Sequence, residues 1–375
     1  MLSTGVLALC ASNTIAAATT DGQADFIKYR DLLIDANTRS WDQVNESSLK
    51  LSMQIQTRYI FNARSELPSG TVTNGFEARR TKIKATGRLD DPRIRYTVGM
   101  AFSRSTGAMS IEDVYARFQM SDEWTLKVGQ FRPSVMREQA ISSKYQLAAE
   151  RSLLSAAFGQ SYNQGVAFLY RTDKVRATAS VMDVTDTFAG DRIWEYILRG
   201  EVMLSGKRSE MSDFTSFRDD DPATMIGAGI GYLDADPADP ADADTSTLNW
   251  SVDLTAEFGG SSVFVALVGA QIEEDGSPDV DQFGALIQGA FFINDKTELF
   301  ARFTHGDDDS GEGLNLVELG MNHYLNRHNA KFTIDAGYSF DQMTTTWRSG
   351  GAGWRPDIDG EEGQFVLRGQ VQLLF

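Results

Sequence analysis

Apolar and polar residues alternate along most of this chain, beginning near residue 49. In the stretch LKLSMQIQTRYIF, Leu51, Met53 and Ile55 share one parity, and Ser52 and Gln54 share the other. A period of two residues is the spacing at which side chains emerge on opposite faces of a β-strand. Because the same two-faced pattern recurs to the C-terminus, we expect an all-β chain.

Sixteen segments with this pattern are predicted as strands. They are 49–61, 76–89, 93–103, 112–119, 124–131, 163–171, 175–184, 193–203, 224–233, 247–258, 262–272, 281–292, 297–305, 314–325, 330–341 and 363–375. Short links such as 121–123 alternate with long ones such as 132–162, except that the long link 204–223 stands where a short one is expected. An even strand number with short turns at one end and long loops at the other is typical of outer-membrane barrels. The pattern therefore predicts a transmembrane antiparallel β-barrel of about 16 strands.

The charged residues predict which face points into the barrel. Arg80, Lys82 and Lys84 share one parity of the second strand, and a basic residue facing lipid would cost about 2–4 kcal/mol at mid-membrane. The basic residues that parity turns toward a polar lumen are Arg58, Arg80, Lys82, Lys84, Arg93, Arg95, Arg117, Lys127, Arg176, Arg199, Arg302, Lys331 and Arg368. On this assignment they outnumber the inward carboxylates, which favours an anion-preferring pore over a balanced one in which acids and bases only pair.

Composition narrows the class of protein. The chain of 375 residues carries a net charge of −17, so nucleic acid is not an expected partner. Acidic runs such as 234–244 fall in the long loops, where a solvated outer surface is expected and contact with lipopolysaccharide through divalent cations is a secondary hypothesis. No metal site and no cofactor are predicted.

The N-terminal region has a different character from the barrel. Residues 1–18 contain a short apolar stretch and Ala16-Ala17-Ala18, which indicate a signal peptide, and the missing basic residues before it suggest a truncated start. The single cysteine, Cys10, lies in this stretch, so the mature chain is expected to need no disulfide. We interpret 19–48 as a periplasmic lead-in and 49–375 as the barrel.

The long link 132–162 is the strongest candidate for a functional loop. Leu147, Leu153 and Leu154 are spaced as in one or two short helices. A loop of this length in a compact fold is usually functional. We expect it to fold into the barrel and narrow the pore.

Several stretches resemble the phosphate-selective porin O and P family of Gram-negative outer membranes. They are FEARRTKIKATGRL (76–89), IEDVYARF (111–118), VGQFRPSVMREQAISSKYQLAAERSLLSAAF (128–158), NQGVAFLY (163–170) and the terminal LRGQVQLLF. The resemblance implies a homotrimer of sixteen-stranded barrels, with the third loop folded inward and arginines at the constriction. Arg79 and Arg80 match the paired arginines of the family, although parity favours only Arg80 as lumenal. Arg132, Arg137 and Arg151 match basic or polar positions of the loop.

The resemblance also bears on export and on the permeant solute. A terminal strand that ends in Phe375 is similar to the signal by which the outer-membrane assembly machinery recognises its clients. The dense lysine cluster that accompanies phosphate specificity in some members is not evident, so the family name alone does not establish phosphate as the solute.

The expected function is passive diffusion of small anions such as phosphate through a bacterial outer membrane. The alternative is a general or sugar-selective porin without anion preference, for which Tyr115 and Tyr145 are the candidate aromatic residues. An enzyme is disfavoured, because His305, His323 and His328 are the only histidines and no nucleophile and base set accompanies them.

Overall fold

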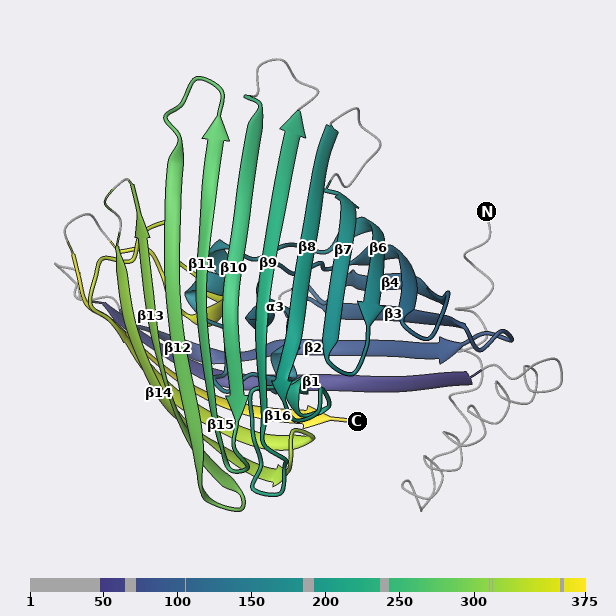
Figure 1. The fold of residues 1–375 in the computed structure, drawn as a ribbon. Coiled ribbons are helices and arrows are strands. Elements are labelled where there is room, and N and C mark those ends of the chain that lie inside the picture. Colours follow the sequence, from purple (N-terminus) through teal and green to yellow (C-terminus); the bar gives the residue numbers. More distant parts are fainter. Residues whose placement is uncertain are drawn as a thin grey trace, which may run out of the picture.

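The strands close into a single barrel in a computed structural model of the chain (Figure 1). The structure describes residues 48–64, 72–104, 106–184, 192–236, 243–309, 311, 313–357 and 361–375. The expected signal peptide and all of the lead-in except Ser48 lie outside these residues. No helix in the described part of the chain is long and apolar enough to cross a membrane.

All sixteen predicted strands are confirmed. They are β1 (Ser48–Arg64), β2 (Val72–Arg88), β3 (Ile94–Phe102), β4 (Met109–Gln119), β5 (Trp124–Phe131), β6 (Asn163–Arg171), β7 (Val175–Asp183), β8 (Arg192–Ser205), β9 (Ala223–Asp236), β10 (Thr245–Glu257), β11 (Ser261–Glu274), β12 (Val280–Asn294), β13 (Thr297–Asp308), β14 (Leu314–Asn326), β15 (Ala330–Ser339) and β16 (Gln364–Leu374). The largest difference in bounds is at the start of β2, expected at Phe76 and observed at Val72.

The first and last strands pair with each other and close the barrel, as the sequence predicts. The register of β1 and β16 runs from Gln54 opposite Leu374 to Arg64 opposite Gln364. Phe375 continues this ladder, because its N–H donates to the Met53 carbonyl at 3.0 Å and its carbonyl accepts from the Met53 N–H at 3.1 Å. Every strand therefore has a neighbour on both sides, which satisfies the backbone in a lipid environment.

The apolar face of the strands is exposed and the polar face is buried, which is the reverse of a sheet in a soluble protein. On β10, Trp250 and Val252 are 36% and 45% exposed, whereas Ser251 and Asp253 are 2% and 3% exposed. Apolar side chains thus cover the outside and polar side chains are enclosed. This arrangement is the one expected for a barrel surrounded by lipid.

The third loop, which is the connection between β5 and β6 (residues 132–162), crosses the inside of the barrel. It contains helix α3 (Arg137–Ala140), a 3-10 turn (Ser143–Tyr145) and helix α4 (Leu153–Ala157), and Figure 1 shows α3 within the ring of strands. The Val135 carbonyl accepts hydrogen bonds from Arg199 on β8 and Ser251 on β10. Further along the loop, the Leu147 carbonyl accepts from Asn322 on β14. Since these strands lie on different sides of a closed barrel, the loop spans the lumen.

A second connection, between β15 and β16, also packs against the inner side of the barrel. Its side chains Met343 and Trp347 are fully buried and Trp354 is 1% exposed, in one apolar cluster with Leu154 of the third loop and residues of the strands β11 to β14 and β16. The ring of Trp347 lies 6.1 Å from that of Phe158 in the third loop. The two loops therefore share a hydrophobic core inside the barrel.

The unusually long link between β8 and β9, residues 206–222, also packs against the inner side of the barrel. The Phe214 ring lies 4.7 Å from Phe264 of β11, and the Phe214 carbonyl accepts from the Ser262 hydroxyl at 2.7 Å. Phe217 packs on Tyr324 of β14 at 5.0 Å between ring centroids. This link is long because it supplies core residues to the barrel interior.

Candidate functional site

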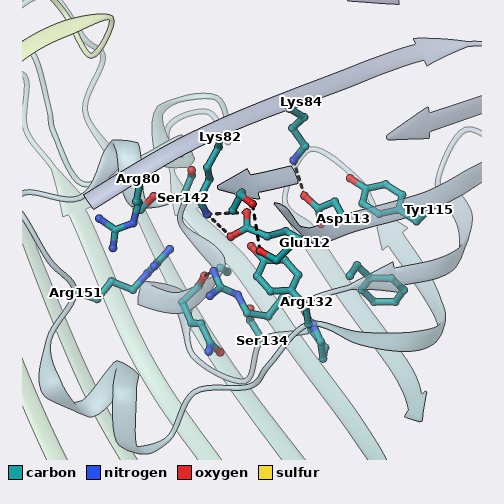
Figure 2. Close-up of a pocket in the computed structure, with 18 of the residues that line it drawn as sticks. Arg80, Lys82, Lys84, Glu112, Asp113, Tyr115, Arg132, Ser134, Ser142 and Arg151 are labelled. Carbon is teal, nitrogen blue, oxygen red and sulfur yellow. Dashed lines mark hydrogen bonds and ion pairs between the residues drawn. The ribbon is translucent and has the colours of Figure 1, made fainter. Parts of the chain in front are cut away.

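A cavity of about 880 Å³ remains between the third loop and the inner faces of β2 to β8 (Figure 2). Among the residues that the structure describes, eleven basic side chains line it, namely Arg79, Arg80, Lys82, Lys84, Arg104, Arg117, Lys127, Arg132, Arg151, Arg176 and Arg199. Four carboxylates from the same described ranges line it, namely Glu77, Glu112, Asp113 and Glu201. The walls of the cavity are therefore strongly positive in a chain whose net charge is −17.

A β-bulge places two consecutive arginines on the inner face of β2. The register between β1 and β2 shifts between Gln56, which pairs with Arg80, and Thr57, which pairs with Ala78. Arg79 is thus the extra residue of the bulge, and a bulge of this kind redirects a side chain at the point where alternation is broken. Both Arg79 and Arg80 consequently line the cavity, where strict alternation allowed only Arg80.

The two arginines converge on Glu150 of the third loop. Arg79 Nε donates to Glu150 Oε1 at 2.5 Å, and Arg80 Nη2 donates to Oε2 at 2.6 Å. Arg58 of β1 completes the group, with its Nη1 2.6 Å from Oε1. Burial raises the pKa of Glu150, but the charges of the three arginines outweigh this effect and hold the pKa below its ordinary value. The carboxylate is therefore ionised and ties the tip of the loop to β1 and β2.

A second bulge places two consecutive carboxylates opposite the lysines of β2. Gly99 of β3 pairs with Asp113, and the next residue pairs with Ile111, so Glu112 is the extra residue. Lys82 Nζ lies 2.5 Å from Glu112 Oε1, and Lys84 Nζ lies 2.7 Å from Asp113 Oδ2 (Figure 2). These pairs reduce the positive charge of this part of the wall.

Four cavity-lining cations have partners that carry no opposite charge. Arg117 donates to the Tyr115 hydroxyl at 3.3 Å, and Lys127 Nζ lies 4.0 Å from the centre of the Tyr115 ring. Arg132 and Arg151 donate to backbone carbonyls of the third loop. Burial lowers the pKa of Arg151 to about 10, so the guanidinium stays charged at neutral pH. The positive field of the cavity therefore comes mainly from this group of four.

Ten of the basic residues predicted from the sequence line this cavity. They are Arg79, Arg80, Lys82, Lys84, Arg117, Lys127, Arg132, Arg151, Arg176 and Arg199.

Arg302 and Lys331, which were also predicted to face the lumen, are buried and donate to the Glu150 and Gln146 carbonyls of the third loop. Five further predicted basic residues also lie outside the cavity. Arg58 and Arg368 point inward as predicted but are 2% and 0% exposed, because the loop between β15 and β16 covers them and its carbonyls accept their hydrogen bonds. Arg137 is buried under the link between β8 and β9 and donates to the Met211 carbonyl. Arg93 lies in the turn before β3, exposed and paired with Asp91, and Arg95 lies exposed near the start of β3, opposite Arg117. These five do not line the cavity.

Sequence reasoning did not single out Glu150 or Arg104. Arg104 follows β3 and pairs with Glu77, which parity alone does not indicate because Arg104 lies beyond the strand. Glu150 had a usable signal, since it is one of two acidic residues in a loop otherwise rich in bases. An acidic residue in a loop expected to enter a basic lumen is a candidate partner for the arginines there.

The residues considered for the alternative functions are dispersed. Tyr115 lines the cavity, but Tyr145 packs against His328, with 5.0 Å between ring centroids. His305 and His323 bond to Asn315 and Thr297. Among the described residues, no group of three or more His, Cys, Asp or Glu side chains is placed to hold a metal ion.

The fold is similar to those of solved porins. An anion-selective porin from Comamonas acidovorans superposes with a TM-score of 0.66 at 11% identity, over 88% of this chain and 100% of that one. OprB of Pseudomonas putida gives 0.60 at 10% identity, over 92% and 97% of the two chains. A loop L8 deletion mutant of OmpT from Vibrio cholerae gives 0.60 at 15% identity, over 88% and 100%. Identities this low establish the fold alone.

The sequence itself matches a family profile. No curated protein matches the sequence significantly. The profile described as phosphate-selective porin O and P matches residues 54–304, which is more than half of the chain. The chain therefore belongs to the phosphate-selective porin O and P family.

Proposed function

We propose that this porin prefers small anions, phosphate among them, over cations. The observation that supports the proposal is the cavity wall, with eleven basic side chains against four carboxylates. In a water-filled pore, fixed positive charges raise the local concentration of anions and lower that of cations. Several weak sites in series let an anion enter one site and leave from the next, so diffusion stays fast.

As a member of its family, the chain is a porin of the Gram-negative outer membrane, a channel rather than an enzyme. No chemical step is needed, because the solute crosses down its own concentration gradient. What the chain contributes is the geometry and charge of the cavity between the third loop and the strands β2 to β8.

The alternative is a general porin without anion preference, and the ion pairs of the cavity favour it. Lys82 with Glu112 and Lys84 with Asp113 cancel charge locally, and Glu150 offsets part of the arginine group. The anion preference then depends on the four cations without acidic partners, Arg117, Lys127, Arg132 and Arg151. The positive charge of these four side chains exceeds the negative charge of the carboxylates that remain in the cavity wall. Our conclusion is therefore an anion-preferring channel.

We further propose that the functional assembly is a homotrimer. A solved structure of OmpT from Vibrio cholerae that shares the fold is described as a trimer form, with a TM-score of 0.57 at 14% identity. The apolar outer face, with residues such as Trp250 exposed, would contact outer-membrane lipid, lipopolysaccharide and neighbouring subunits. We also propose that the outer-membrane assembly machinery inserts the chain into the membrane.

The reversal potential across a KCl gradient tests the proposed preference. The purified oligomer is inserted into a planar bilayer with a tenfold KCl gradient, and the voltage of zero current is measured. An anion-preferring pore gives a voltage with the sign of the chloride equilibrium potential. A voltage with the sign of the potassium potential would overturn the proposal, and one near zero would favour the general porin.

A further inference from the structure

Three arginines of the pore wall converge on a carboxylate that belongs to the chain itself. Glu150 Oε1 accepts from Arg58 Nη1 at 2.6 Å and from Arg79 Nε at 2.5 Å, and Oε2 accepts from Arg80 Nη2 at 2.6 Å. We propose that the Glu150 carboxylate occupies an oxyanion site formed by these arginines and thereby prevents the pore from retaining the anions that it passes.

The geometry is that of an anion-binding site with its ligand in place. Guanidinium groups bind carboxylate and phosphate oxygens through the same planar N–H donors, and such charge-assisted hydrogen bonds are the strong ones. Four of them, from three arginines, are directed at the two oxygens of Glu150, which is more than one structural ion pair requires. A carboxylate on the chain competes with free anions at an effective concentration on the order of millimolar or higher.

Solutes in the pore can reach the arginines of this site. Arg79 and Arg80 line the cavity, and their side chains are 28% and 10% exposed, compared with 6% for Glu150. Arg58, which is 1% exposed, lies behind them. Figure 2 shows the Arg80 and Arg151 side chains next to each other, so an anion near Arg80 lies beside a further positive charge.

The loop does not depend on the Glu150 carboxylate for its place in the barrel. Barrel side chains bond to the backbone of residues 146–150: Lys331 to the Gln146 carbonyl at 2.8 Å, Asn322 to the Leu147 carbonyl at 3.0 Å, Asp335 to the Ala149 N–H at 2.8 Å and Arg302 to the Glu150 carbonyl at 3.1 Å. Leu147, Leu153 and Leu154 are buried in the core next to them. Removal of the carboxylate should therefore empty the site without releasing the loop.

The inference rests on the proposed anion channel and deepens it. It predicts that the unaltered chain conducts anions with little saturation, because its strongest oxyanion site is already filled. It also predicts that Glu150→Ala converts the same pore into one that holds oxyanions, since the side chain of alanine leaves room beside three guanidinium groups.

The test is the block of KCl current by inorganic phosphate, measured on the reconstituted oligomer. We expect Glu150→Ala to lower the half-blocking phosphate concentration by about tenfold or more, which corresponds to one additional charge-assisted hydrogen bond. Glu112→Ala is the matched control. It removes one carboxylate from the same cavity but frees only Lys82, so the half-blocking concentration should change by about fivefold at most, the effect of a single charge in water.

A second variant keeps the test decisive if Glu150→Ala does not assemble. Glu150→Gln retains the shape of the side chain and removes its charge. It should also lower the half-blocking phosphate concentration, by a smaller factor than Glu150→Ala. An unchanged phosphate block in the assembled variants would overturn the inference. The reversal potential of the unaltered chain separates this result from failure of the proposed function, because a cation-preferring pore would contradict anion preference whatever Glu150→Ala does.

Discussion

Arg79 and Arg80 are consecutive in the sequence, yet both side chains lie on the inner face of β2 and donate hydrogen bonds to the carboxylate of Glu150. The β-bulge at Arg79 makes this possible, because it adds one residue on β2 against the regular ladder of β1. The bulge thus doubles the positive charge at one level of the pore. It also places the charge where the third loop supplies Glu150 as a partner.

Lys127→Met should weaken anion preference more than any substitution of an ion-paired residue. Lys127 Nζ lies 3.7 Å from the centre of the Phe131 ring and 4.0 Å from that of Tyr115, and it forms no ion pair with a carboxylate of the described residues. A single charge in an aqueous pore is worth about 1 kcal/mol, or about fivefold in the permeability ratio. Reversal potentials in a KCl gradient measure that ratio.

Lys207→Met is the control for this prediction. Lys207 is exposed, pairs with Asp221 at 3.2 Å and does not line the cavity. It should leave the permeability ratio unchanged, although the net charge changes by the same amount. Equal ratios for the unaltered channel and Lys127→Met would show that this lysine does not contribute to selectivity.

Arg368→Met should destabilise the barrel. Arg368 is fully buried, its Nε and Nη2 atoms lie 2.5 Å from Asp335 and Glu318, and its Nη1 donates to the Ala352 carbonyl at 3.0 Å. Loss of the guanidinium leaves Asp335 buried without its charge partner, which costs about 3–5 kcal/mol. Urea unfolding of the barrel in lipid vesicles, followed by tryptophan fluorescence, gives the change in the free energy of unfolding.

Arg93→Met provides the comparison for Arg368→Met. Arg93 also has a carboxylate partner, Asp91 at 2.6 Å, but the pair lies in an exposed turn. Water screens such pairs and they contribute little to stability. The urea concentration at the midpoint of unfolding should be unchanged for Arg93→Met and lower for Arg368→Met. Equal midpoints for the two variants would contradict a structural role for Arg368.

The strands could be predicted from the sequence because their signal is local. Alternation of apolar and polar residues located every strand of the barrel, and parity assigned Lys82, Lys84, Arg117 and Lys127 to the inner face, where all four line the cavity. The period of two follows from backbone geometry alone. It holds wherever one face meets lipid and the other meets polar surroundings.

The parts that could not be predicted depend on breaks in that period or on distant contacts. The bulges at Arg79 and Glu112 turn one extra residue inward, and nothing in the spacing of neighbouring residues marks them. Parity placed Arg368 correctly inside the barrel, but it could not show that the loop between β15 and β16 covers it. Glu150 meets Arg58 across 92 positions of sequence, so only the folded chain brings them together.

Gly351→Leu should lower the single-channel conductance. A Cβ atom at Gly351 would lie 2.8 Å from Arg79 Nη2, which is the far end of a flexible side chain, so Arg79 would be displaced into the cavity rather than the backbone strained. Gly350→Leu is a closely matched control, because the same position on Gly350 has no atom within 4 Å. Conductance in planar bilayers compares the two, and equal values would show that this loop does not border the conducting path.

Phe375→Ala should reduce assembly in cells without preventing refolding of the purified chain. The Phe375 side chain is 70% exposed, and the hydrogen bonds of residue 375 to Met53 come from the backbone, which alanine retains. The closed barrel therefore loses little stability when the ring is removed, whereas an assembly signal that depends on the ring would be lost.

Leu373→Ala is the control, because it removes an exposed apolar side chain from the same face two residues earlier and should assemble normally. The assembled fraction is measured from heat-modifiable gel mobility of outer-membrane preparations, alongside refolding yields in detergent. If Phe375→Ala assembled as well as Leu373→Ala in cells, the terminal ring would not act as a signal. If Phe375→Ala lowered both the refolding yield and the assembled fraction in cells, the ring would instead stabilise the seam between β1 and β16.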